Sequence, residues 1–85
     1  MRVQITPHKD KQGFFTVTPH GSIDTDTHED FRSHLKDILA PSTRGILIDL
    51  KNVDYISSAG LGVLFFAKKF LTENGGELVF CHPKP

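Results

Sequence analysis

The stretch from Asp54 to Leu64 runs from the end of a strand through two serines into a strongly apolar helix. A strand that leads into such a helix is typical of α/β proteins, in which the apolar face of the helix is buried against a sheet. With 85 residues, 38% of them hydrophobic and 24% charged, the chain has room for only one thin core. We therefore expect residues 1–85 to form a single small α/β domain.

Four segments have the alternation or the composition of strands. The third is nearly continuous in apolar residues, as expected for a parallel strand buried on both faces. Pro19 and Gly21 should end the second strand, because proline cannot donate to a sheet ladder and glycine permits a turn. The four segments are those around Val3 and Ile5, Phe14 to Thr18, Gly45 to Leu50, and Glu77 to Cys81.

Two segments have the periodicity of amphipathic helices. In the first, from Asp24 to Ala40, the apolar residues lie in one stripe, and Pro41 should stop the helix. In the second, which follows Ser58, a broad apolar stripe should face the sheet, while Leu61 and Phe65 fall on the opposite side. The chain is therefore predicted to form a mixed β-sheet of about four strands with two main helices.

Leu61 and Phe65 share their side of the second helix with Lys68 and Lys69, which indicates that this side faces solvent. Large exposed apolar residues near the start of a helix indicate a protein-binding patch. The alternatives are that a dimer partner or a loop covers them, or that they are ordinary scattered surface residues.

Ser57 and Ser58 have two interpretations. The first helical turn has unpaired N–H donors and the positive end of the helix dipole, so it would stabilise an anionic group such as a phosphate on one of these serines. A serine at this place also serves as an N-cap, which stabilises a helix by about 1 kcal/mol. The residues alone leave both roles open.

Asp24 and Asp49 are the acidic candidates for the same site. Asp24 stands at the start of the first helical segment, where it is either a cap or pre-helix residue or has a functional role. Asp49 interrupts an apolar strand, so its carboxylate must lie near the strand end or be hydrogen-bonded. Because sites gather at the carboxyl ends of parallel strands, we expect Asp49 to point towards the Asp24 and Ser58 loops. The alternative is a carboxylate that braces neighbouring loop amides.

Composition excludes several classes of protein. Ten basic and ten acidic residues give a formal net charge of zero, and no Lys/Arg cluster predicts nucleic-acid binding. Cys81 is the only cysteine, so it should be a small buried apolar residue in a reducing compartment. The N-terminus lacks the apolar core of a signal peptide, and no apolar run reaches the roughly 20 residues that span a bilayer. We expect a cytoplasmic protein.

Catalytic and metal motifs are also weak. Ile56 stands two positions before Ser58, where the nucleophile elbow of hydrolases has glycine, and no phosphate-loop lysine follows Gly60 or Gly62. We therefore predict no catalytic residue, no metal site and no cofactor. The histidines lack ligand spacing and should be surface residues. They are His8, His20, His28, His34 and His82.

Three motifs together resemble the STAS domain of bacterial anti-sigma factor antagonists. They are Gly21 to Thr27, Tyr55 to Leu64, and Gly75 to Val79. The resemblance implies a non-catalytic protein that binds an anti-sigma factor, which is also a serine kinase, and so releases the sigma factor. It further implies that this kinase uses ATP to phosphorylate the serine at the helix start and that a phosphatase resets it. Matching Gly60-Leu61-Gly62 to the family's Gly-Leu-Gly makes Ser58 the acceptor.

We expect the partner surface to consist of Asp24, Asp49, Ser57, Leu61 and Phe65. Many phosphorylated members have aspartate immediately before the acceptor, whereas Ser57 stands there in this chain, so Ser57 is the second choice for modification. Similar domains continue after the last strand with a helix, a short strand and a final helix. Without them the last strand is an exposed edge, which favours a homodimer or a larger assembly. The alternative function is a non-switching STAS scaffold or a transport-associated subunit.

Overall fold

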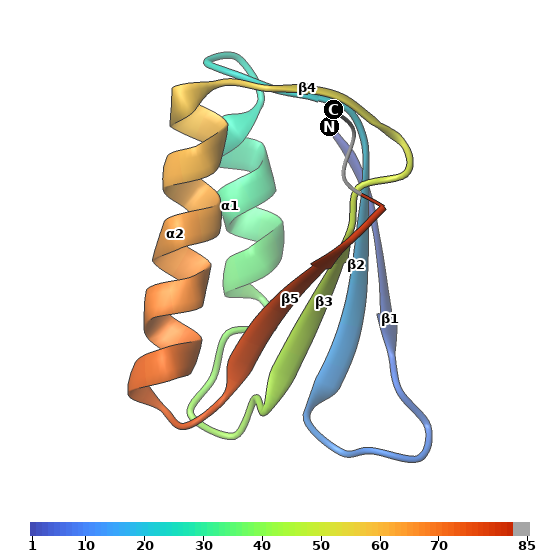
Figure 1. The fold of residues 1–85 in the computed structure, drawn as a ribbon, viewed down its shortest axis with the longest axis vertical. Helices are drawn as coiled ribbons and strands as arrows, with labels where there is room; N and C mark the ends of the chain where they lie inside the picture. The colour runs from blue at the N-terminus through green and yellow to red at the C-terminus, as the bar shows by residue number, and fades with distance from the viewer. Residues whose placement is uncertain (83–85) are drawn as a thin grey trace.

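The computed structural model describes residues 1–82 and contains an α/β domain with both helices on one side of the sheet (Figure 1). The α/β class, the mixed sheet and the two helices predicted from the sequence are confirmed. The elements in chain order are β1 (Arg2–Pro7), β2 (Phe14–Ile23), α1 (His28–Lys36), β3 (Gly45–Asp49), β4 (Val53–Ile56), α2 (Ser58–Glu73) and β5 (Glu77–Cys81).

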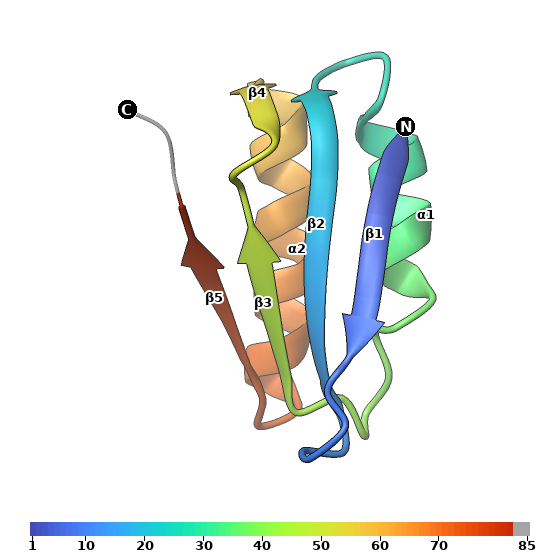
Figure 2. The same ribbon diagram turned by 90° about the vertical axis from the view of Figure 1, so that its right-hand side faces the viewer.

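The five-stranded sheet has the order β1-β2-β3-β5, and β4 pairs with β2 beyond the end of β3. β1 runs antiparallel to β2, while the other strand pairs are parallel. Figure 2 shows the sheet from the side that carries no helix, with α1 and α2 behind it. We call this uncovered side the open face. Within residues 1–82, β5 pairs with β3 alone, so β5 forms one edge of the sheet.

The hydrophobic core lies between the two helices and the covered face of the sheet. Phe31 and Leu35 of α1 are fully buried there, and the apolar stripe predicted for α2 is confirmed by the burial of Val63, Leu64 and Leu71. The strands contribute a further set of buried residues, namely Val17, Ile23, Ile46, Ile48 and Val53, and Leu50 in the loop after β3 is buried as well. In the part of the chain that the structure describes, no helix has both the length and the apolar character needed to cross a membrane.

The prediction that Pro19 and Gly21 end the second strand is wrong. β2 continues through both residues to Ile23, because β4 pairs with its last three residues. Pro19 is tolerated in the gap between the residues of β2 that pair with β3 and those that pair with β4. Gly21 has a φ of 91° and lies at a shift in the strand register, which bends β2 towards β4. The short strand β4 was not among the predicted strands.

Helix α1 is shorter than the predicted segment from Asp24 to Ala40. At its start, the Asp24 carboxylate accepts hydrogen bonds from the backbone N–H groups of Asp26 (3.0 Å) and Thr27 (3.2 Å). These bonds fix a turn, so the helix begins only at His28. At the other end, α1 already stops at Lys36, so Pro41, which restricts only the residue before it, does not set the end of the helix.

Candidate functional site

The loops that carry Asp24 and Ser57 meet where β2 and β4 end. Ile23 is paired with Ile56, and the Ser57 N–H donates to the Ile23 carbonyl oxygen at 2.9 Å. Asp24 and Ser57 are the residues that directly follow these two strand ends. The parallel pairing therefore holds the Asp24 loop beside the serines that begin α2.

Gly60 lets α2 begin close against these strand ends. A Cβ atom at Gly60 would lie 2.6 Å from the Ile23 carbonyl oxygen and 3.0 Å from Cγ2 of Ile56. A Cβ atom this close to a backbone oxygen would force α2 or the end of β2 to shift, so glycine is favoured at this position. Gly62 is different, because a Cβ there would meet nothing within 4 Å.

The two serines have different positions in α2. Ser57 is the N-cap: its backbone is extended, and its hydroxyl accepts a hydrogen bond from the Gly60 N–H at 3.2 Å. Ser58 is the first residue of the helix, its side chain is exposed, and its hydroxyl makes no hydrogen bond to any of the residues that the structure describes. The first turn of α2 contains no acidic residue. The cap role therefore belongs to Ser57, and the Ser58 hydroxyl is accessible.

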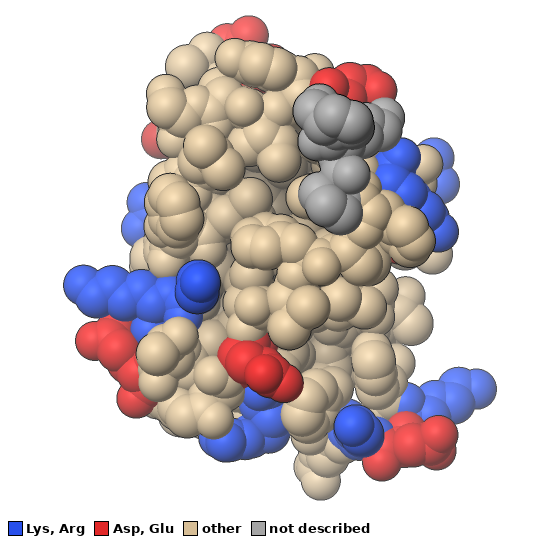
Figure 3. All heavy atoms as spheres, in the orientation of Figure 1, with Lys and Arg blue, Asp and Glu red and all other residues tan. Residues whose placement is uncertain are grey.

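The prediction that Leu61 and Phe65 face solvent is confirmed: the exposed fraction of the surface is 43% for Leu61 and 65% for Phe65. On a helix, Ser58, Leu61, Phe65 and Lys68 lie on one side, and we call them the Ser58 stripe. In Figure 3 mainly uncharged atoms cover the N-terminal part of α2, and Lys and Arg atoms gather beside its middle. The stripe is thus an apolar surface with an accessible hydroxyl at one end and a basic group at the other.

An open groove of about 260 Å³ lies between α1 and α2 next to the Ser58 stripe. His28 and Arg32 line it from α1, and Ala59, Gly62 and Phe66 line it from α2. The Arg32 guanidinium lies 4.6 Å from the centre of the Phe66 ring, a cation–π contact that fixes the side of the groove. The groove is therefore a hollow between the two helices that adjoins the Ser58 stripe.

Asp24 has a demonstrated structural role in the turn before α1. Its carboxylate accepts the two backbone hydrogen bonds described above, and the Thr27 hydroxyl donates to the Ser22 carbonyl oxygen at 2.7 Å. Asp24 is also half-exposed at the edge of the serine loop. It therefore holds a negative charge in the loop that lies beside Ser57.

Asp49 does not point towards the Asp24 and Ser58 loops, so that prediction is wrong. Ile48 is buried in the core, and because side chains alternate along a strand, Asp49 lies on the open face, away from α2. Its carboxylate accepts the Lys51 N–H at 3.0 Å and lies 3.0 Å from Nδ1 of His82. The Lys51 hydrogen bond, followed by the His82 contact, lowers the pKa of Asp49. Asp49 thus braces loop amides, which was the alternative prediction.

Two features of the surface were not predicted from the sequence. Tyr55 of β4 is 60% exposed, and Asp49, Cys81 and His82 gather at the ends of β3 and β5. Cys81 is half-buried rather than buried, and its burial, together with the Asp49 carboxylate, raises the pKa of its thiol. The sequence signal for this group was a cysteine followed directly by a histidine at the end of a predicted strand. The carboxyl ends of parallel strands meet at one edge of a sheet, which brings this pair to the Asp49 strand.

The family profile of the STAS domain matches residues 7–85 of the chain. The chain belongs to the STAS domain family. Its relatives include the putative anti-sigma factor antagonist BtrV of Bordetella bronchiseptica, with 34% identity over 86% of this chain and 63% of that protein. The anti-sigma F factor antagonist of Paenibacillus polymyxa is 27% identical over 100% of this chain and 71% of that protein. This STAS chain therefore spans about two thirds of the length of these relatives.

The fold agrees with this membership. The anti-sigma factor antagonist SpoIIAA in its unphosphorylated form superimposes with a TM-score of 0.81, over 99% of this chain and 76% of that chain. The phosphorylated form of SpoIIAA superimposes with a TM-score of 0.77. Sequence identity to both is 15%, so these comparisons establish the STAS fold.

Proposed function

We propose that this STAS domain is an anti-sigma factor antagonist whose binding surface is the Ser58 stripe and whose binding is switched off by phosphorylation of Ser58. The observation that carries the proposal is that the two serines have different structural roles. Ser57 caps α2, while the Ser58 hydroxyl is exposed beside Leu61 and Phe65. A kinase can therefore reach Ser58 without breaking the cap.

The names of the relatives support this proposal. The Bordetella and Paenibacillus proteins are both described as anti-sigma factor antagonists, the former as a putative one. The structural neighbour SpoIIAA is described in unphosphorylated and phosphorylated forms. The proposal transfers this role to a chain whose fold agrees with that of SpoIIAA throughout the matched region.

The physical effect of a phosphate on Ser58 would be local. Phosphorylation adds about −1.5 to −2 charges, and the N-terminus of α2 stabilises them through its dipole and its unpaired N–H groups. The fold should therefore survive the modification. A partner that docks on Leu61 and Phe65 would have to remove water from that phosphate and accept its charge beside Asp24, which weakens binding. Asp49 takes no part, because it lies on the open face.

The proposed partner is an anti-sigma factor that also acts as a serine kinase, with a serine phosphatase reversing the modification. Leu61 and Phe65 would insert into an apolar surface of this partner, and Lys68 and Lys69 would face acidic residues at its rim. The STAS chain itself has no catalytic role in this proposal. Its compartment would be the cytoplasm, where sigma factors act.

The test is phosphorylation by a candidate anti-sigma factor kinase of the same organism with ATP, followed by intact-mass and fragment analysis. We expect one phosphoryl group on Ser58, none in the variant Ser58→Ala, and normal modification in Ser57→Ala. Modification of Ser57 instead would contradict the assignment of the acceptor. A kinase that binds the domain but modifies no serine would favour the non-switching scaffold or transport-associated role.

A further inference from the structure

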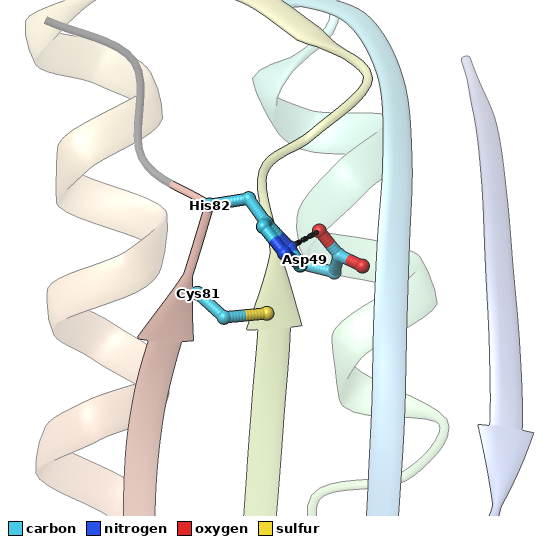
Figure 4. Close-up of side chains that lie close together, drawn as sticks. All are labelled: Asp49, Cys81 and His82. Carbon is cyan, nitrogen blue, oxygen red and sulfur yellow. Dashed lines mark hydrogen bonds and ion pairs between the residues drawn. The ribbon is translucent and has the colours of Figure 1, made fainter.

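A second group of reactive side chains lies on the open face, away from the Ser58 stripe. Asp49, Cys81 and His82 come together at the carboxyl ends of β3 and β5 (Figure 4). One carboxylate oxygen, the thiol sulfur and one imidazole nitrogen all lie within 4.8 Å of one another. The proposed switch does not use any of these three atoms.

The backbone of the two strands fixes this group. Asp49 is paired with Cys81 in the parallel register of β3 and β5, so their side chains lie on the same face. The Leu50 N–H donates to the Cys81 carbonyl oxygen at 2.9 Å, which holds the strand ends together. His82 follows with a φ of 55°, and its ring turns back so that Nδ1 lies 3.0 Å from Oδ1 of Asp49.

We propose that Asp49, Cys81 and His82 bind a transition-metal dication, and that zinc is the best match. Zinc takes thiolate, imidazole and carboxylate ligands at about 2.0 to 2.3 Å, whereas calcium and magnesium prefer oxygen ligands alone. Three protein ligands leave the fourth tetrahedral position for water or for a donor from a second molecule. The mixed set of oxygen, sulfur and nitrogen is what distinguishes this site from an ordinary acidic surface cluster.

Binding requires small and local changes. The Cys81 thiol loses its proton to solvent, and the His82 imidazole coordinates through Nδ1 with its proton on Nε2. The His82 side chain is 65% exposed, so it can rotate to bring its Nδ1 towards an ion held between Asp49 and Cys81. The Lys51 N–H keeps its hydrogen bond to Asp49 and orients the carboxylate from outside the ligand shell.

One positive charge opposes the metal ion. The Lys51 ammonium lies 3.6 Å from Oδ2 of Asp49, the oxygen that does not contact His82. Its side chain is 58% exposed and can swing into solvent when the ion binds. The bound ion would replace the contact between Asp49 and His82 and the ion pair between Asp49 and Lys51. In their place, metal–ligand bonds would join β3 to the edge strand β5.

The experiment uses the untagged protein, stripped of metal with a chelator. Titration with zinc chloride in a calorimeter should show one saturable site per chain, or one per two chains if a second copy supplies the fourth ligand. Cobalt(II) chloride should give a thiolate-to-cobalt charge-transfer absorption band. Cys81→Ser should abolish this band. His82→Gln should weaken zinc binding at least about tenfold, because loss of a residue that merely supports a metal ligand already lowers metal affinity by about that factor.

The matched control is His8→Gln, which removes another exposed histidine, one that contacts the Thr16 hydroxyl instead. This variant should bind zinc as tightly as the parent protein. Far-UV circular dichroism of each variant confirms that the fold is retained. Zinc binding that persists in both Cys81→Ser and His82→Gln would place the ion elsewhere, for example at Asp30 and His34, and overturn the proposal. Absence of saturable binding and of the cobalt band in the parent protein would overturn it as well.

Discussion

Gly60 lies so close to Ile23 that a methyl group on Gly60 would come within 2.6 Å of the Ile23 carbonyl oxygen. This contact joins the start of α2 to the end of β2. The same strand end accepts the Ser57 N–H, so the contact and the hydrogen bond together set where Ser58 emerges. The position of the proposed acceptor therefore depends on a residue that carries no functional group.

The variant Gly60→Ala should destabilise the fold by about 1 to 3 kcal/mol, because the added methyl group overpacks the contact with Ile23. The matched control is Gly62→Ala, where the Cβ meets no atom and the gain in helix propensity should stabilise α2 by roughly 0.5 to 1 kcal/mol. Urea unfolding of both variants measures the difference. Equal effects in the two variants would show that Gly60 is not in close contact.

The two serines should respond differently to alanine. Ser57→Ala removes the cap and should cost about 0.5 to 2 kcal/mol of unfolding free energy. Ser58→Ala removes an exposed hydroxyl and should change the unfolding free energy by no more than about 0.5 kcal/mol. Thermal and urea unfolding of the unphosphorylated variants test this pair. A larger loss for Ser58→Ala than for Ser57→Ala would assign the cap to Ser58 and contradict its role as the accessible acceptor.

Leu61→Ala and Phe65→Ala should weaken binding to the anti-sigma factor by about 1 to 2 kcal/mol or more while leaving stability nearly unchanged. Both residues are exposed, so the folded chain alone gains little from them. Leu64→Ala is the control: Leu64 belongs to the same helix but is buried in the core, and its truncation should cost about 2 to 5 kcal/mol of stability. Binding isotherms and unfolding curves measure both effects. Unchanged affinity in the Leu61 and Phe65 variants would move the partner surface elsewhere.

The sequence predicts α2 well because the helix is long and its periodicity is clear. The buried residues Val63, Leu64 and Leu71 and the exposed residues Leu61 and Phe65 all lie where the pattern placed them. The end of β2 was mispredicted, since pairing with β4 is a long-range contact that overrides the local turn signals of Pro19 and Gly21. The turn propensity of proline and glycine reflects only their neighbours in the sequence and cannot predict pairing with a distant strand.

The direction of Asp49 could not be predicted for a related reason. An almost entirely apolar strand does not indicate which residues face the helices, and only the packing of Ile48 in the core fixes Asp49 on the open face. The meeting of Asp49 with Cys81 depends on the register between β3 and β5, which are joined through β4 and α2. Such a group becomes visible only in three dimensions. The phosphorylation of Ser58 and its partner remain predictions.

The central claim is that a phosphate on Ser58 prevents partner binding without unfolding the domain. The most direct test compares the affinity of the anti-sigma factor for the unmodified protein and for protein carrying phosphoserine at position 58. Phosphoserine at Ser42, an exposed residue at the other end of the molecule between α1 and β3, is the charge-matched control. We predict at least roughly tenfold weaker binding for phosphoserine at 58, about 1.4 kcal/mol, with the control and the circular dichroism spectra unchanged. Equal affinities of the two phosphorylated proteins and the unmodified protein would contradict the claim.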